Sequence, residues 1–436
     1  MTHEQSLATQ PGAFAQSPSR TASERRRAVR AGIIGNTLEW YDFGVYGFLA
    51  TVLAKQFFPE SGQYIGLLQT FGAFGVGFLA RPLGSILLGR MGDIVGRKAV
   101  LTLTILMMAI GTIAIGVVPT YERIGIAAPL VLLIARVLQG LAAGGEWGNA
   151  AAFLAEWAKP GRRGFYGGLL LASVSGGLLL GSGVAACVST LLSPEQMTDW
   201  GWRIPFLLGA ALIPVGLYMR RNVQEPPKFR AQASAGEVPQ HQTAFPALLL
   251  RAACICLPLL MASYMVTVYM PSYAQLYGSI PRSMALWANT CALALTVVGA
   301  PIVGLMSDLY GRRRQMLICA VLLIVMAYPM YWLIASGVSF SAFFAIQMLL
   351  TAVVVGFNGA VPATVTELFP TSTRAVGAAL ANAIAGVFGG FTPFISTWLI
   401  KASGSVASPA WLVVFCAVAA LLALVGMKEM AHRELT

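Results

Sequence analysis

The stretch Gly89-Arg-Met-Gly-Asp93-Ile-Val-Gly-Arg97-Lys98 returns in the second half of the chain as Gly304-Leu-Met-Ser-Asp308-Leu-Tyr-Gly-Arg312-Arg313. Both copies follow the pattern G-x-x-x-D-x-x-G-R-[K/R], and each lies in a short polar turn between two long apolar segments. A turn repeated at equivalent places indicates an internal duplication in which both halves run in the same direction. The repeat therefore predicts a membrane protein built from two related bundles.

The composition agrees with this interpretation. The chain is 57% hydrophobic and 11% charged, whereas a soluble domain is about 25% charged. Windows of about 20 residues locate six apolar runs in each half. These runs are residues 31–55, 63–88, 99–118, 126–156, 165–192 and 204–219, then 246–273, 284–306, 315–335, 340–366, 375–400 and 408–427. We therefore expect an all-α integral membrane protein with twelve transmembrane helices in two six-helix bundles.

Polar segments divide the chain around these runs. We expect a polar tail over 1–30, an N-terminal bundle over 31–220, a linker over 221–245, a C-terminal bundle over 246–428 and a short tail over 429–436. The first 30 residues contain no apolar run of the kind found in a cleaved signal peptide. We therefore interpret them as a disordered tail.

The net charge of +12 is distributed unevenly along the chain. Lys and Arg gather in the tails, the linker and alternate connections, for example at 25–27, 97–98, 162–163, 220–221 and 312–314. The positive-inside rule places these connections and both termini in the cytoplasm, with the chain in the cell inner membrane and in contact with lipid. Nucleic-acid binding would need these charges on one surface with base-stacking aromatics. We therefore expect no nucleic acid as a partner.

The residues that usually hold metals or nucleotides are absent or isolated. All six cysteines lie in apolar runs, and the three histidines lie outside them. No metal-ligand spacing and no nucleotide-binding G-x-x-x-x-G-K-[S/T] motif occurs. We therefore expect no metal, no cofactor and no nucleotide-driven pump. No clustered catalytic constellation is visible either, so we expect the chain not to be an enzyme.

Carboxylates inside the apolar runs are candidates for proton coupling, because a charge at that depth is costly and marks function. In the first run, Asn36, Glu39, Asp42 and Tyr46 recur at helical spacing and share one face. Burial and mutual repulsion favour proton uptake by Glu39 and Asp42. Glu146 in the fourth run is a third candidate. Static pairing of these acids with buried arginines is the alternative.

Two arginines lie deep in the apolar runs, Arg81 in the second and Arg136 in the fourth. A guanidinium binds a carboxylate through two parallel hydrogen bonds, so these residues predict an anionic substrate. Gln139 lies one turn from Arg136 and adds a neutral donor. Further candidates for substrate binding are uncharged polar residues at similar depth, namely Asn36, Tyr46, Tyr264, Tyr269 and Asn358. Neutralisation of Glu39 or Asp42 by Arg136 is the alternative role for that arginine.

The repeated turns are candidates for a gate. Asp93 and Asp308 can accept hydrogen bonds at a helix N-terminus, and Arg97 and Arg312 can pair with acids on an adjacent helix. A looser repeat, Glu156-x6-Arg163 and Glu367-x6-Arg374, supplies such partners. We expect these residues to close the cytoplasmic ends of the bundles. The alternative is that they are solvated loop charges.

Several stretches together resemble a known family. They are Gly35-Asn-Thr-Leu-Glu-Trp-Tyr-Asp-Phe43, Arg81-Pro-Leu-Gly84, Arg136-Val-Leu-Gln-Gly140 with Gly144-Gly-Glu146, and Trp200-Gly-Trp-Arg-Ile-Pro-Phe206. With the paired turns, they resemble the metabolite:proton symporters of the major facilitator superfamily. The resemblance implies a midplane site reached alternately from each side and proton-driven uptake of a small organic acid or zwitterion.

The resemblance is strongest to the citrate and tricarballylate carriers, through residues 266–273, 367–370 and 389–396. It implies a monomer that carries a small organic anion with protons. A di- or tricarboxylate such as citrate is the first expectation, and 2-oxoglutarate, shikimate or proline with betaine are alternatives. A drug:proton antiporter that exports its substrate is the alternative of another class. Such antiporters usually carry a Gly-Pro-rich motif in the fifth helix, whereas residues 173–183 contain no proline.

Overall fold

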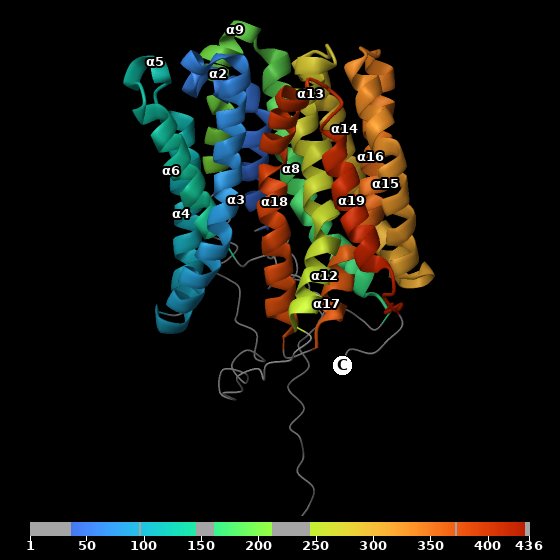
Figure 1. Cartoon of the computed structure of the whole chain (residues 1–436). Coiled ribbons are helices and arrows are strands. Elements are labelled where there is room, and N and C mark those ends of the chain that lie inside the picture. Colours follow the sequence, from blue (N-terminus) through green and yellow to red (C-terminus); the bar gives the residue numbers. More distant parts are fainter. Residues whose placement is uncertain (1–35, 96, 145–160, 212–244, 371–372, 432–436) are drawn as a thin grey trace, which may run out of the picture.

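The computed structural model describes residues 36–95, 97–144, 161–211, 245–370 and 373–431, and the regular elements in these segments are helices (Figure 1). Five long helices are uninterrupted: α3 (Gly62–Val95), α8 (Arg163–Leu191), α14 (Arg282–Tyr310), α15 (Arg312–Ala335) and α18 (Arg374–Ser403). Three shorter ones are α4 (Arg97–Val117), α6 (Ala127–Ala142) and α19 (Ala410–Leu424). The first predicted run is represented by helical residues 36–48 and, after a turn at Leu49, by α2 (Ala50–Phe57). The sixth is represented by helical residues 203–211.

Two further spans are interrupted. Residues 245–277 comprise α12 (Phe245–Leu257), two π-helical turns, η3 (Pro258–Ala262) and η4 (Met265–Tyr269), and α13 (Met270–Tyr277). Residues 340–368 comprise α16 (Phe340–Asn358) and α17 (Val361–Leu368). Short elements, among them α5 (Tyr121–Ile124) and α9 (Pro194–Gln196), connect the spans. Each of the twelve apolar runs thus contains helix, and the predicted all-α membrane fold is confirmed.

The helix lengths fit a membrane. Among the described residues, seven helical segments are long and apolar enough to cross it, and three shorter apolar helices accompany them. With 34 residues, α3 spans about 51 Å, against about 30 Å of hydrocarbon. Large apolar side chains such as Ile110, Val325 and Leu422 are exposed on the outside of the bundles, which is the surface that lipid tails would cover.

Local signals explain where several helices begin and end. The Ser339 hydroxyl accepts a hydrogen bond from the Ala342 amide and caps the start of α16. Gly404, with a φ of +68°, ends α18 in the left-handed conformation that glycine adopts without strain. Pro258 removes one helical hydrogen bond at the start of η3, which explains why the seventh span changes pitch there.

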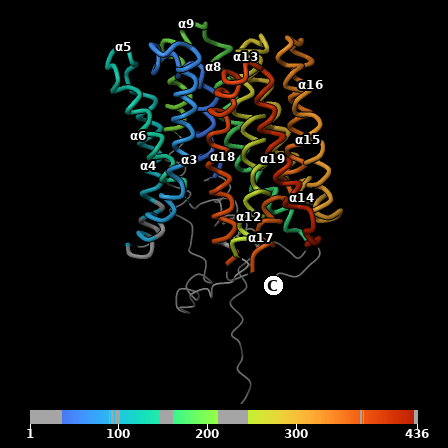
Figure 2. Tube along the Cα trace, viewed as in Figure 1, coloured from blue at the N-terminus to red at the C-terminus, as the bar shows by residue number. Residues whose placement is uncertain are grey.

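The two halves meet along two helix pairs. In Figure 1, α4 and α6 lie at one flank and α15 and α16 at the other, and Figure 2 shows the same arrangement as a tube coloured along the chain. Between the flanks, α8 packs against α14, and α3 against α18. We call the end that carries α17 and the starts of α8 and α15 the α17 end, and the opposite end, with α5 and α9, the α9 end.

Glycines permit the closest helix contacts. A Cβ at Gly168 would meet the backbone carbonyl of Ala300, so the α8 and α14 backbones approach directly. Within the N-terminal half, a Cβ at Gly140 would likewise meet the Gly77 carbonyl, and one at Gly84 the Leu141 carbonyl. These contacts fix α3 against α6 by backbone packing.

Replacement of Gly84 by Ala is expected to destabilise the N-terminal half by about 1–3 kcal/mol, because the added methyl group must displace backbone. The measurement is the Tm of the purified protein in detergent. Gly183→Ala is the matched control, because its Cβ would meet nothing closer than Thr290 Cγ2 at 3.8 Å. Equal Tm values for the two variants would contradict the close α3–α6 contact.

Candidate transport site

Arg81 is held in the middle of the molecule by aromatic rings. Its guanidinium carbon lies 5.1 Å from the ring centre of Trp40, 4.4 Å from that of Phe43 and 4.2 Å from that of Phe78. Cation–π contacts of this kind offset part of the cost of burying the charge. Nε and Nη2 have no hydrogen-bond partner among the described residues. The arginine therefore keeps donors for a ligand.

A cavity of about 180 Å³ lies beside Arg81, between the two halves. Helices α3 and α8 line it from the N-terminal half, and η3, α14, α16 and α18 from the C-terminal half. Among the described residues that line it, Arg81 carries the sole charge. The polar groups are otherwise neutral: Ser85, Ser175, Ser263, Tyr264, Thr267, Thr296, Thr351, Asn358 and Asn382. Such a cavity favours a ligand with negative charge.

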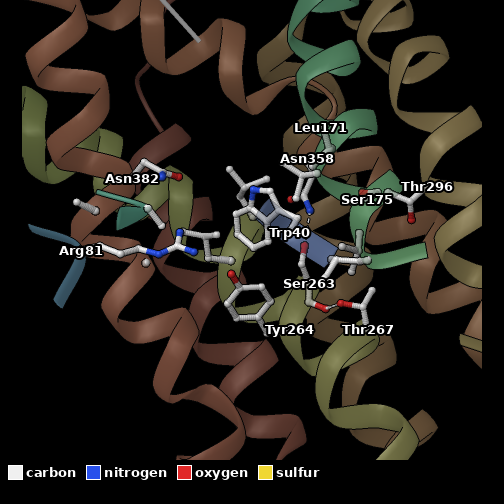
Figure 3. A pocket seen from close by; sticks show the side chains of 18 of the residues that line it. Trp40, Arg81, Leu171, Ser175, Ser263, Tyr264, Thr267, Thr296, Asn358 and Asn382 are labelled. Atoms are coloured by element: carbon white, nitrogen blue, oxygen red, sulfur yellow. Dashed lines mark hydrogen bonds between the residues drawn. The ribbon is translucent and has the colours of Figure 1, made fainter. Parts of the chain in front are cut away.

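The C-terminal wall is built where the seventh span changes pitch. Ser263 and Tyr264 lie between η3 and η4, and the Asn358 amide donates a hydrogen bond of 2.7 Å to Ser263 Oγ. Figure 3 shows Arg81 pointing toward Trp40 and Tyr264. The Tyr264 hydroxyl and the Asn358 carbonyl oxygen have no hydrogen-bond partner among the described residues. Both groups can bond a ligand in the cavity.

Arg136 forms a second buried site behind this cavity. Its side chain is 0% exposed, and Nη1 donates a hydrogen bond of 2.9 Å to Gln139 Oε1. Gln139 Nε2 in turn donates to Thr112 Oγ1 at 3.0 Å. Thr112 and Asp42 are neighbours, because a Cβ at Gly209 would lie 2.6 Å from Asp42 Oδ1 and 3.3 Å from Thr112 Cγ2. Arg136, Gln139 and Thr112 thus form a buried series of hydrogen bonds that ends beside Asp42, and the Gln139 amide bonds these residues rather than facing the cavity.

Phe43 separates the two sites. Its ring centre lies 4.4 Å from the Arg81 guanidinium carbon and 4.7 Å from that of Arg136. Tyr46 and Phe74 cover Arg136 on other sides, with distances of 4.5 and 5.1 Å. Arg136 and Asp42 do not line the cavity. The structure therefore brings Arg81 and Arg136 close together but gives them different surroundings.

The other residues selected from the sequence divide between these sites and the bundle interior. Tyr264 and Asn358 line the cavity. Asn36 instead donates to Ser173 Oγ at 2.7 Å, and the Tyr46 hydroxyl donates to the Thr70 carbonyl at 3.0 Å. Tyr269 packs against Phe71 and Tyr273. Glu39 is half-buried outside the cavity lining, and Glu146 lies outside the described residues.

Sequence reasoning missed Trp40, Ser263 and Thr112. Trp40 lies between Glu39 and Asp42 in the first helix, so its position beside two acids was an available signal. Ser263 follows Pro258 by little more than one turn, and the proline was a signal for irregular backbone. Thr112 sits in an apolar run where a single hydroxyl carries no distinguishing pattern.

The charged residues of the C-terminal turn meet at the α17 end. Arg312 pairs with Asp308 at 3.1 Å and also with Glu367, and Arg163 pairs with Glu367 at 3.1 Å. Asp308 accepts hydrogen bonds from the first amides of α8, Gly164 at 2.8 Å and Phe165 at 3.0 Å. These contacts join the two halves, and we call Asp308, Arg312, Glu367 and Arg163 the gate cluster after the gating role that the sequence predicts for them.

The remaining gating candidates are placed less completely. Arg374 is buried and donates from Nε to the Thr366 carbonyl at 2.9 Å. Glu156 lies outside the described residues, and the side chains of Asp93 and Arg97 lie outside what the structure describes. The contacts expected for Glu156, Asp93 and Arg97 in the N-terminal half therefore stay predictions.

Two helical bundles around a central cavity, closed at one end by ion pairs, define a membrane transporter. The chain belongs to the Major Facilitator Superfamily, whose family model matches residues 32–279 and 278–431. The fold agrees: a D-xylose-proton symporter structure superposes with a TM-score of 0.75 at 16% identity, covering 92% of this chain and 97% of that one.

Curated relatives are named as carriers of several small molecules. A proline/betaine transporter of Escherichia coli (strain K12) is 35% identical over 424 residues, 94% of this chain and 85% of the relative. A citrate-proton symporter of Klebsiella pneumoniae is 37% identical over 396 residues, 89% of this chain and 88% of the relative. An alpha-ketoglutarate permease of Escherichia coli (strain K12) is 35% identical over 425 residues, 95% and 96% of the two chains. These relatives confirm a transporter rather than an enzyme.

Proposed function

We propose that this protein takes up a small organic carboxylate together with protons by alternating access. The observation that carries the proposal is Arg81, a cation in a cavity whose other described polar groups are neutral. A buried charge is costly unless an opposite charge pairs with it. A carboxylate in the cavity would supply that pairing at the interface of the two halves. Citrate-proton symporters among the relatives support the coupling to protons.

Asp42 is our first candidate for the proton carrier, with Glu39 and Glu146 as further candidates. It is buried, and one of its oxygens, Oδ1, has no hydrogen-bond partner among the described residues. Proton uptake there would change the charge beside Thr112, which Gln139 links by hydrogen bonds to Arg136. We propose that a proton on Asp42 and an anion on Arg81 together neutralise the centre, which lowers the barrier to rocking.

A di- or tricarboxylate such as citrate is our first candidate substrate. The Tyr264 hydroxyl, which has no hydrogen-bond partner among the described residues, can donate to a carboxylate oxygen that Arg81 does not reach. Arg136, however, lies behind Phe43 and does not line the cavity. The argument that two arginines bind the substrate therefore loses support. The other carboxylates of a di- or tricarboxylate must accept hydrogen bonds from neutral donors or be protonated.

A zwitterion such as proline or betaine is the second candidate. The observation that favours it is that Trp40 and Tyr264 line the same cavity as Arg81. Aromatic faces bind quaternary and secondary ammonium groups, while the arginine would hold the carboxylate. Proline/betaine transporters among the relatives are consistent with this candidate.

We place the α17 end in the cytoplasm. Arg312, Arg313 and Arg314 lie at that end, and cytoplasmic connections carry an excess of basic residues. By the same rule we propose that both termini are cytoplasmic, and the family supports a location in the inner membrane. Each half supplies one side of the cavity, so we propose that the monomer is the functional unit.

Uptake of labelled citrate into proteoliposomes, with and without an inward proton gradient, tests the proposal. We expect gradient-dependent accumulation that excess tricarballylate reduces more than 2-oxoglutarate, shikimate, proline or betaine. Strong uptake of proline or betaine without citrate uptake would favour the zwitterion. Accumulation driven by an outward proton gradient alone would instead indicate an antiporter that exports its substrate.

A further inference from the structure

Glu429 connects the C-terminal segment to the start of a distant helix. It lies beyond α19, yet its Oε1 accepts a hydrogen bond from the Arg312 amide at 3.0 Å and its Oε2 one from the Arg313 amide at 3.1 Å. The amides of Met430 and Ala431 bond the same carboxylate at 3.1 and 3.2 Å. Arg313 Nε also donates to the Leu424 carbonyl, the last residue of α19, at 3.1 Å.

The start of α15 needs such a cap. The first amides of a helix have no partner within the helix, and Gly311, which precedes α15, provides no side-chain cap. Gly311 has a φ of +95°, and a Cβ there would lie 2.8 Å from Glu429 Oε2. The glycine of the turn motif therefore serves both the backbone conformation and the approach of the carboxylate.

The carboxylate is well suited to this role. Burial raises the pKa of Glu429, but the backbone N–H groups of Arg312, Ala431, Arg313 and Met430 lower it by more, so the pKa lies below its ordinary value. Glu429 is therefore charged near neutral pH. A negative charge at a helix N-terminus also interacts favourably with the helix dipole.

The capped residue belongs to the gate cluster. Arg312 is 1% exposed and holds both Asp308 and Glu367. Those two carboxylates in turn bind the N-terminal half, Asp308 through the Gly164 and Phe165 amides and Glu367 through Arg163. An unbroken series of contacts thus leads from Glu429 through Arg312 to the start of α8.

We propose that Glu429 is a positioning residue of the gate: by capping α15 it holds Arg312 in the gate cluster, so that the C-terminal segment stabilises the closed α17 end. The proposal rests on the alternating-access function proposed above. The alternative is that Glu429 only stabilises the fold of α15.

The experiment compares Glu429→Ala and Glu429→Gln with a matched control, Glu195→Gln. Glu195 is an exposed acid in the short helix α9, with a local hydrogen bond to Ser193 and no part in the gate cluster. Kinetics of proton-driven uptake give KM and maximal rate. Spin labels on cysteines at Arg90 and Val376, both exposed at the α17 end of α3 and α18, report opening in the absence of substrate. The exposed Cys187 and Cys291 are replaced by serine in every sample.

We expect Glu429→Ala to lower the maximal rate roughly fivefold, with KM changed by less than about twofold. The loss of a charged cap should shift the equilibrium between the closed and open α17 end, but it should not change how the cavity binds substrate. The distance distribution between the labels should extend to longer values. Glu429→Gln keeps one acceptor oxygen and should be intermediate, and it serves as the test if the alanine variant does not fold.

A lowered Tm with an unchanged distance distribution would overturn the proposal and leave Glu429 a structural role. If no carboxylate is transported even by the wild type, the proposed function fails, but the spin-label distances still decide the role of Glu429. An identical distribution for Glu195→Gln and Glu429→Gln would also refute the positioning role.

Discussion

Replacement of Asp42 by Asn is expected to abolish proton-driven accumulation while exchange of substrate for substrate continues. The asparagine is similar in size and remains polar, but it cannot take up and release a proton. With the membrane potential clamped at zero, each coupled proton supports about tenfold accumulation for a gradient of about one pH unit. In the variant, the internal substrate concentration should therefore rise no higher than about the external concentration.

The matched control is Asp199→Asn, the same change at an exposed acid outside the membrane spans. It should accumulate substrate as the wild type does. Equal loss of accumulation and exchange in Asp42→Asn, with normal insertion in the membrane, would show that the carboxylate pairs statically in the fold. Retained accumulation would indicate that Glu39 or Glu146, rather than Asp42, carries the coupled proton.

Replacement of Arg81 by Lys is expected to weaken the apparent substrate affinity by roughly 10- to 150-fold, because charge-assisted hydrogen bonds contribute about 1.5–3 kcal/mol. The lysine keeps the charge but loses the planar fork and its stacking on Trp40, Phe43 and Phe78. Binding of labelled substrate to the purified protein at equilibrium measures the effect without the transport steps.

Arg203→Lys is the control for this prediction. Arg203 also stacks on a tryptophan, with its guanidinium carbon 4.2 Å from the Trp202 ring centre, and donates to the Val118 carbonyl, away from the cavity. It should bind substrate with unchanged affinity. An unchanged affinity in Arg81→Lys would show that the Arg81 guanidinium does not bind the substrate.

The fold could be predicted from the sequence because a bilayer imposes simple requirements. Apolar runs of sufficient length must form helices, and the repeated turn indicated how the halves are related. The interruptions were harder to predict. The π-helical turns after Pro258 depend on packing that a hydropathy window does not contain, and they place Ser263 and Tyr264 on the cavity wall.

The site could be predicted only in part, because a helix face does not specify its neighbours. Helical spacing placed Asn36 and Tyr46 beside Asp42, yet both use their polar groups on other helices. Burial also did not distinguish Arg81, which faces the cavity, from Arg136, which faces aromatic rings and Gln139. Charged residues in the two repeats gave a better indication, since Asp308 and Arg312 of the turn meet Glu367 and Arg163 of the looser repeat in the structure.

The neutral wall that the C-terminal half contributes to the cavity bears on how such carriers diversify. Ser263, Asn358 and Asn382 are uncharged and line the cavity, whereas Asp42 and Arg136, the residues that we propose to be linked to the proton, do not line it. Under the proposed function, we expect substitutions there to alter which molecule fits beside Arg81 and to leave the coupling to protons unchanged. The proposed function therefore assigns the choice of molecule beside Arg81 to the C-terminal wall and the coupling to protons to the N-terminal half.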